Sequence, residues 1–103
     1  MNIQYLIDGH FDMLSDVAAR RKKGERQVIR RLYWPDFLAG KVTGVIASLF
    51  VDSQYLPFGA MEIAMEQASS LLQEIEESPD ILMLCTCAED FIRAAGEHKL
   101  GVL

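Results

Sequence analysis

Residues 42–51, Val-Thr-Gly-Val-Ile-Ala-Ser-Leu-Phe-Val, form the nearly continuous apolar run that decides the predicted fold. A strand with apolar side chains on both faces is typical of a parallel sheet. A second apolar run, residues 3–8, precedes it, and a long stretch of helical pattern separates the two. Such a connection is a crossover, so the two strands are predicted to be parallel neighbours. Gly44 within the run indicates a close backbone approach or a kink.

Helices are predicted on both sides of this strand. Residues 13–23 carry apolar side chains on one face and end at Gly24, residues 26–33 hold a further short turn, and Pro35 opens a short helix that reaches Ala39. Residues 59–77 form the clearest helix, and its apolar stripe is predicted to pack in the core. A binding stripe that includes its methionines is the alternative. The stripe consists of Met61, Ala64, Met65, Ala68, Leu71, Leu72 and Ile75.

The last part of the chain repeats the strand–helix–strand pattern. Residues 81–85 form another apolar run, and Thr86 with Glu89 is predicted to form a capping box that opens a helix over residues 87–96. A new strand begins at Lys99, and no helix follows to cover its far face. The pattern therefore predicts an α/β protein with about three parallel strands and helices, one domain over residues 1–103 that is incomplete as given.

Composition excludes several classes of function. The net charge of −5 argues against nucleic-acid binding, where a basic domain is expected. No apolar run approaches the roughly 20 residues of a membrane helix, and the N-terminus resembles no signal peptide. We therefore expect no membrane partner and a cytoplasmic location.

Two local features leave alternatives open. Most of the basic residues lie between residues 20 and 31, where they predict a solvated helix–loop–helix surface or, less favoured, a patch for phosphate or another anionic surface. Cys85 and Cys87 are predicted to be buried, reduced thiols, since neighbours two apart are poor disulfide partners. A metal or redox site with Asp90 or His98 is the alternative.

Polar side chains cluster where the first strand ends. Asp8, Gly9, His10 and Asp12 follow the apolar run, and sites in parallel α/β folds gather at the carboxyl ends of strands. The spacing of His10 and Asp12 lets both side chains point the same way, and both are good zinc ligands. Asp8 is either an acceptor for a ligand histidine or a simple strand-end carboxylate. A structural histidine is the alternative for His10, and His98 is predicted to be exposed.

Residues 7–12, Ile-Asp-Gly-His-Phe-Asp, resemble the first metal motif of the membrane (renal) dipeptidase family of the amidohydrolase superfamily, in which a strand ends in Asp-Gly-His-x-Asp. Residues 36–45 are similar to that family's short helix, glycine and second strand. Residues 59–77 match its long helix, and residues 85–103 match the helix and third strand that follow. The resemblance covers essentially the whole chain in order.

This resemblance implies the N-terminal portion of a (β/α)₈ TIM barrel with a two-zinc site at its C-terminal face. In it His10 and Asp12 bind one zinc, while a bridging glutamate and two histidines would come from strands beyond Leu103. A metal-bound hydroxide would attack a dipeptide or a small amide. The chain is thus expected to be the N-terminal part of a zinc-dependent, dipeptidase-like hydrolase, a metalloprotease, and to be inactive alone.

A different class of function is also consistent with the sequence. The predicted sheet leaves one apolar face uncovered, and exposed apolar faces mark interaction surfaces. The chain could then be a non-catalytic structural or interaction module that forms a homo-oligomer through this face. Mass in solution discriminates between this hypothesis and the hydrolase.

Overall fold

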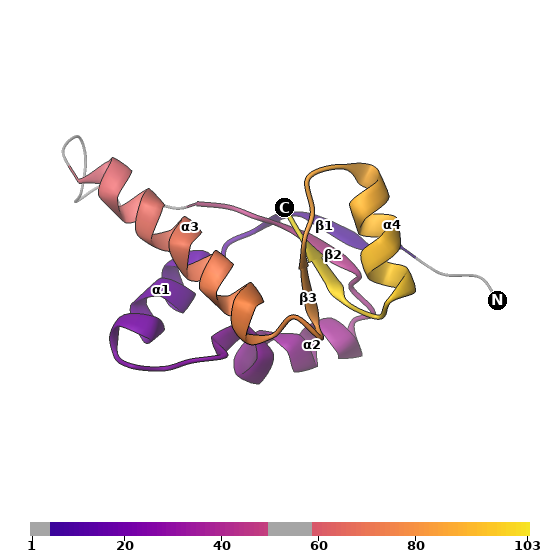
Figure 1. The fold of residues 1–103 in the computed structure, drawn as a ribbon, viewed down its shortest axis with the longest axis horizontal. Helices are drawn as coiled ribbons and strands as arrows, with labels where there is room; N and C mark the ends of the chain where they lie inside the picture. The colour runs from indigo at the N-terminus through magenta and orange to yellow at the C-terminus, as the bar shows by residue number, and fades with distance from the viewer. Residues whose placement is uncertain (1–4, 50–58) are drawn as a thin grey trace.

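The structure, a computed structural model, describes residues 5–49 and 59–103 and contains one four-stranded parallel sheet in the order β1-β2-β4-β3 (Figure 1). The prediction of an α/β protein with a parallel sheet is confirmed. The described residues form four strands rather than about three, because the 81–85 run and the final residues each contribute a strand to the sheet. The strands are β1 (Ile7–Phe11), β2 (Gly44–Ala47), β3 (Leu82–Leu84) and β4 (Leu100–Val102).

Helices lie on both faces of this sheet, so the prediction that one apolar face is left uncovered is wrong, because α4 packs there. The first face is covered by α1 (Leu14–Lys22), the π-helical turn η1 (Ile29–Tyr33), α2 (Trp34–Ala39) and the C-terminal half of α3 (Ala60–Glu77). The opposite face carries α4 (Ala88–Gly96), which contacts β2, β3 and β4. In Figure 1, α4 accordingly stands apart from the other helices.

The main core lies on the first face. Val45 of β2 and Val102 of β4 are fully buried there, and Phe11 at the end of β1 packs edge-on against Tyr33 and Phe37. Alternation along a strand sends every second side chain to this side. The buried members of the cluster are Met13, Leu14, Val17, Val28, Ile29, Phe37, Val45, Leu71, Ile81, Leu82, Leu100 and Val102.

A pair of glycines shapes the opposite face. Gly44 of β2 is paired with Gly101 of β4, and the ring of Phe91 from α4 lies directly on both. A Cβ atom built on Gly44 would stand 2.6 Å from Phe91 Cδ1, and one on Gly101 would stand 2.8 Å from the same atom. The close backbone approach predicted at Gly44 is therefore confirmed, and the glycines are what allow α4 to sit on the sheet.

The first strand differs from its prediction. The sequence predicts a buried strand over residues 3–8, whereas β1 is Ile7–Phe11 and most of it is exposed; residues 3 and 4 lie outside the described range. Tyr5, Leu6 and Ile7 retain 48%, 51% and 42% of their accessible surface. The reason is position: β1 is an edge strand with one neighbour, and α4 packs mainly on β4. The second strand is also shorter than predicted, although residues 50 and 51 of that prediction lie outside the described ranges.

Helix α3 has the predicted length, but the prediction that its apolar stripe is buried is wrong at three positions. Met61, Met65 and Leu72 are 74%, 64% and 51% exposed. The N-terminal half of α3 projects beyond the sheet beside α1, so the described strands do not cover it (Figure 1). The buried face instead includes polar side chains: its buried residues are Gln67, Ser70, Leu71 and Glu74.

The capping box predicted at Thr86 and Glu89 is also wrong. Cys87 is the N-cap of α4, so the helix begins one residue later than a Thr86 cap requires. Asp90 reaches back instead, and its Oδ2 accepts hydrogen bonds from the Thr86 backbone N–H at 2.9 Å and from Thr86 Oγ1 at 3.1 Å. These hydrogen bonds lower the pKa of Asp90, and the bond from the Thr86 backbone has the largest effect.

The basic stretch is a solvated surface over most of its length, as predicted, but Arg21 is an exception because it is buried and pairs with α3. Arg21 on α1 is only 8% exposed and donates to Glu74 Oε2 at 2.5 Å, to both oxygens of Glu77 at 2.7 Å and to Gln73 Oε1 at 2.8 Å. The fully buried Glu74 also accepts the backbone N–H of Ile29 at 2.7 Å. We call Arg21, Glu74 and Glu77 the buried ion cluster. It ties α1, α3 and the start of η1 together.

The buried ion cluster makes stability depend on pH. Hydrogen bonding from Arg21, helped by the backbone N–H of Gln27, lowers the pKa of Glu77 to about 2, against 4.5 for an ordinary glutamate. The unfolded chain thus takes up this proton first as pH falls. The stabilisation is complete above about pH 5 and is lost as pH falls through about 2, a loss of about 1–3 kcal/mol. Denaturant unfolding at a series of pH values should show it.

Two variants isolate this contribution. Glu77→Gln should be less stable than wild type at neutral pH and should approach it near pH 2, because glutamine does not titrate. Glu62→Gln, an exposed position on the same helix, should track the wild-type profile. A Glu77→Gln profile parallel to that of wild type would contradict the assignment.

Three helices end with the same hydrogen-bond pattern. In α1 the residue after the C-cap is Gly24, with φ +96°, as the predicted stop requires. In α2 and α4 the equivalent residues are Lys41 and His98, with φ of 57° and 59°. In both helices the next residue donates to a carbonyl five positions back, the Schellman arrangement. A residue with a Cβ is strained in this left-handed region.

Replacing Lys41 or His98 by glycine is therefore expected to stabilise the protein by about 0.5–1 kcal/mol each. Gly24→Ala should destabilise it by a similar amount, since that variant introduces the strain that the other two remove. The midpoint of urea unfolding measures all three. If Lys41→Gly and Gly24→Ala shifted the midpoint in the same direction, the strain argument would be wrong.

Candidate metal centre

His10 and Asp12 meet at the carboxyl end of β1. His10 Nε2 lies 3.2 Å from Asp12 Oδ2, so the two side chains do point the same way, as their spacing predicts. A register irregularity between Asp8 and Phe11 turns the ring of Phe11 into the core. The side chains of His10 and Asp12 remain 74% and 50% exposed. The pair is open to solvent and to further ligands.

A serine from the neighbouring strand completes the surroundings of His10. Ser48 follows β2, its backbone N–H donates to the carbonyl of Phe11 at 3.1 Å, and its Oγ lies 3.0 Å from His10 Nδ1. Because β1 and β2 are parallel, their carboxyl ends meet at one edge of the sheet. Sequence reasoning did not assign a role to Ser48. The sequence could have pointed to Ser48, because it is a hydroxyl residue two positions after Ile46, at the end of the next parallel strand.

Asp8 is a simple strand-end carboxylate, one of its two predicted roles. Its Oδ1 accepts the backbone N–H of His10 at 3.0 Å, which fixes the local bend of β1. This hydrogen bond goes to the backbone of His10 and not to the ring. The position beside Nδ1 of the imidazole is occupied by the hydroxyl of Ser48.

The geometry of His10 and Asp12 fits a shared zinc ion. Two donors at about 2.0–2.2 Å from a tetrahedral zinc stand roughly 3.3–3.5 Å apart, close to the 3.2 Å between Nε2 and Oδ2. The nitrogen and oxygen donor set is also one that zinc accepts. Within residues 5–49 and 59–103, no group of three or more histidine, cysteine or acidic side chains could hold a metal. Among the described residues, His10 and Asp12 are thus a pair of donors and not a complete metal site.

The cysteines and the second histidine lie outside this pair. Cys85 is buried on the α4 side of the sheet, where burial raises the pKa of its thiol. Cys87 is exposed, which corrects half of the prediction of two buried thiols, and both are free. The difference arises because Cys87 is the N-cap of α4 and faces solvent. His98 is exposed, as predicted, and follows the C-terminus of α4.

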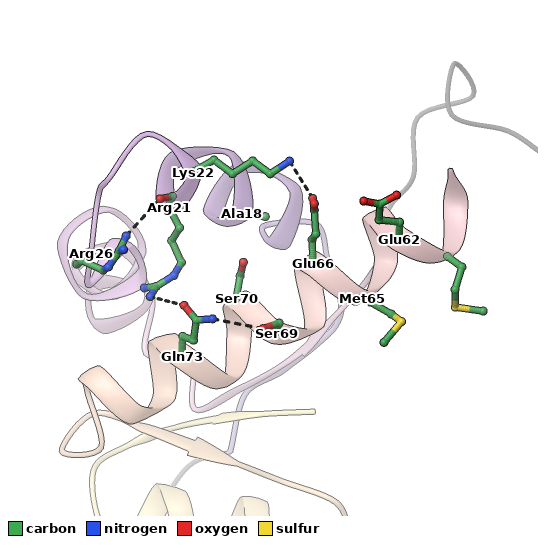
Figure 2. Close-up of a pocket in the computed structure, with 11 residues that line it drawn as sticks. Ala18, Arg21, Lys22, Arg26, Glu62, Met65, Glu66, Ser69, Ser70 and Gln73 are labelled. Atoms are coloured by element: carbon green, nitrogen blue, oxygen red, sulfur yellow. Dashed lines mark hydrogen bonds and ion pairs between the residues drawn. The ribbon is translucent and has the colours of Figure 1, made fainter. Parts of the chain in front are cut away.

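A groove in the described part of the chain lies elsewhere, between α1 and the N-terminal half of α3. It encloses about 820 Å³, and Met61 and Met65 lie along it. Figure 2 shows that Lys22 forms an ion pair with Glu66 and that Arg21 donates a hydrogen bond to Gln73. Of its charged side chains, Lys22 and Glu66 pair with each other, whereas Arg21 and Arg26 pair with Glu77, which lies outside the lining. The lining residues are Ala18, Arg21, Lys22, Arg26, Met61, Glu62, Met65, Glu66, Ser69, Ser70 and Gln73.

Fold and site together define an α/β protein with a parallel sheet and a histidine–aspartate pair at a strand end. Neither a protein-family model nor a curated protein sequence matches the chain. No helix in the described ranges has both the length and the apolarity needed to cross a membrane.

Proposed function

We propose that this chain is the N-terminal, metal-binding part of a zinc-dependent, dipeptidase-like hydrolase that acts on a dipeptide or small amide. The observation that carries the proposal is the convergence of His10 Nε2 and Asp12 Oδ2 at the carboxyl end of a parallel strand. The Asp-Gly-His-x-Asp motif that resembles the membrane dipeptidase family occupies this position. His10 and Asp12 are the residues that would hold the first of two zinc ions.

One part of the arrangement, the order of three strands, supports a barrel of the (β/α)₈ type. The three strands that resemble the first three barrel strands are β1, β2 and β4, and they are neighbours in that order. Strand β3 is then an addition at the outer edge of β4. The face with His10 and Gly44 would become the barrel interior, and α4 would have to leave it, because barrel helices lie outside.

A bound zinc pair supplies Lewis acidity and lowers the pKa of a coordinated water. The chain's own residues have simpler tasks. Asp12 provides a carboxylate oxygen, His10 provides Nε2, and Asp8 fixes the backbone that carries the imidazole. The remaining ligands and the substrate-binding groups would come from other strands, so this chain alone is proposed to be inactive.

Zinc titration of the chain, followed by NMR, tests the ligand pair. Two ligands are expected to bind weakly, with a Kd on the order of 0.1–1 mM, since complete sites reach about 10–16 kcal/mol. Zinc should shift the signals of His10 and Asp12, and His10→Ala should abolish the shift. His98→Ala is the matched control and should leave it unchanged. Binding that is insensitive to His10→Ala would refute the proposal.

One observation favours the second candidate, a self-associating module. Beside α4 lies an apolar groove of about 430 Å³ whose walls include Ile7, Ile46 and Leu103. Ile92 on its rim is 54% exposed. A second copy of the chain could cover this groove. Sedimentation should then give a compact dimer that Ile92→Glu dissociates and that Met61→Glu, on the distant end of α3, leaves intact. A monomer at all concentrations would exclude this candidate.

A further inference from the structure

Both ring nitrogens of His10 have a partner. Nε2 lies 3.2 Å from Asp12 Oδ2, and Nδ1 lies 3.0 Å from Ser48 Oγ. A neutral imidazole carries a single N–H, so one nitrogen must donate and the other must accept. The chemistry of the two partners therefore decides which tautomer is present.

Without metal, the carboxylate sets the tautomer. An ionised Asp12 can only accept a hydrogen bond, so it favours the proton on Nε2. Nδ1 is then an acceptor, and the hydroxyl of Ser48 donates to it. Coordination of a metal by Nε2 reverses this arrangement, because the lone pair of Nε2 must be free and the proton must stand on Nδ1.

We propose that Ser48 is a positioning residue that holds the His10 imidazole in one orientation through this exchange of tautomers. A hydroxyl can donate in the metal-free state and accept from Nδ1–H in the metal-bound state, without movement of either side chain. A carboxylate or a backbone carbonyl in the same place could only accept. The metal-bound half of this inference rests on the proposed function; the metal-free half does not.

The surroundings leave this task to Ser48. Asp8 uses Oδ1 to accept the backbone N–H of His10. Asp12 lies on the Nε2 side of the ring. Ser48 is held in place from the neighbouring strand, because its own N–H donates to the carbonyl of Phe11. Without Ser48, Asp12 would be the one described side chain bonded to the exposed ring of His10.

Nitrogen-15 NMR of the metal-free chain at about pH 8, where an ordinary imidazole is neutral, tests the first half. Wild type should show the Nε2–H tautomer, with Nδ1 shifted as a hydrogen-bond acceptor. Ser48→Ala should lose that shift and broaden the ring signals, and Ser48→Thr should restore both. Ser69→Ala, a serine on α3, is the control. Identical spectra for wild type and Ser48→Ala would overturn the proposal.

Zinc titration of the same variants tests the second half. Ser48→Ala is expected to weaken binding about 10- to 100-fold, as removal of a hydrogen-bond partner of a ligand histidine does, and Ser48→Thr should recover most of it. Equal affinities of wild type and Ser48→Ala would overturn the positioning role. Failure of the proposed function has a different signature, namely zinc shifts that persist in His10→Ala.

Discussion

Replacing Arg21 by methionine is expected to lower the free energy of unfolding by about 3–5 kcal/mol, the cost of breaking a buried ion pair. The variant removes the charged partner of the fully buried Glu74, which keeps the backbone N–H of Ile29. It also removes both hydrogen bonds that Arg21 gives to Glu77. Among the described residues, no buried side-chain polar atom lacks a partner in the native chain, so the change creates a new kind of defect.

A double-mutant cycle separates this defect from lost packing. Arg21→Met combined with Glu74→Leu should recover much of the stability, because an apolar pair can replace a buried ion pair at little cost. Lys22→Met is the matched control: Lys22 pairs with Glu66 at 3.1 Å but is 64% exposed, so its loss should cost under about 1 kcal/mol. Equal effects of Arg21→Met and Lys22→Met would contradict the structural role. If Arg21→Met does not fold, the stability of the double variant still tests whether an apolar pair can replace the buried ion pair.

Gly44→Ala is expected to destabilise the protein by about 1–3 kcal/mol or more through overpacking. The new Cβ would stand 2.6 Å from Cδ1 and 2.7 Å from Cε1 of the Phe91 ring, so α4 must shift away from the sheet. Gly101→Ala should act alike, since its Cβ would meet Phe91 and the Sγ of Cys85, each at 2.8 Å. Thermal or urea unfolding measures both.

Two further variants serve as controls for the contact between Phe91 and the glycines. Gly44→Ala with Phe91→Leu should be less harmful than the two single changes predict, because the smaller side chain makes room. Gly96→Ala, where a Cβ would meet nothing within 4 Å, should be neutral or stabilising. A Gly44→Ala variant as stable as wild type would show that α4 does not pack on this pair of glycines.

The elements that followed from local pattern were predicted well. The length of α3 came from its periodicity, and the parallel direction of β1 and β2 came from the length of the crossover between them. Gly44 was predicted to mark a close approach and does so. Each of these features depends on neighbouring residues in the chain, which a sequence displays directly.

Features that depend on distant residues were predicted poorly. Arg21 lies in a basic stretch typical of a solvated surface, yet it is buried because Glu74 and Glu77 on another helix meet it. Met61 and Met65 have the spacing of a core stripe, yet they are exposed because their end of α3 lies beyond the sheet. Burial is a property of what packs against a side chain, and that is set by the tertiary arrangement.

The site shows the same division. That His10 and Asp12 lie together at the end of a strand follows from the order of residues alone, because alternation along an extended backbone fixes the direction of residues two apart. The parallel sheet follows in the same way, from the run of apolar residues at 42–51. Only the tertiary structure decided that Ser48 contacts His10 Nδ1, that Asp8 binds backbone instead, and that β1 is an exposed edge. Those contacts join segments that are distant in the chain, or depend on a local bend, and only the folded arrangement of the strands determines them.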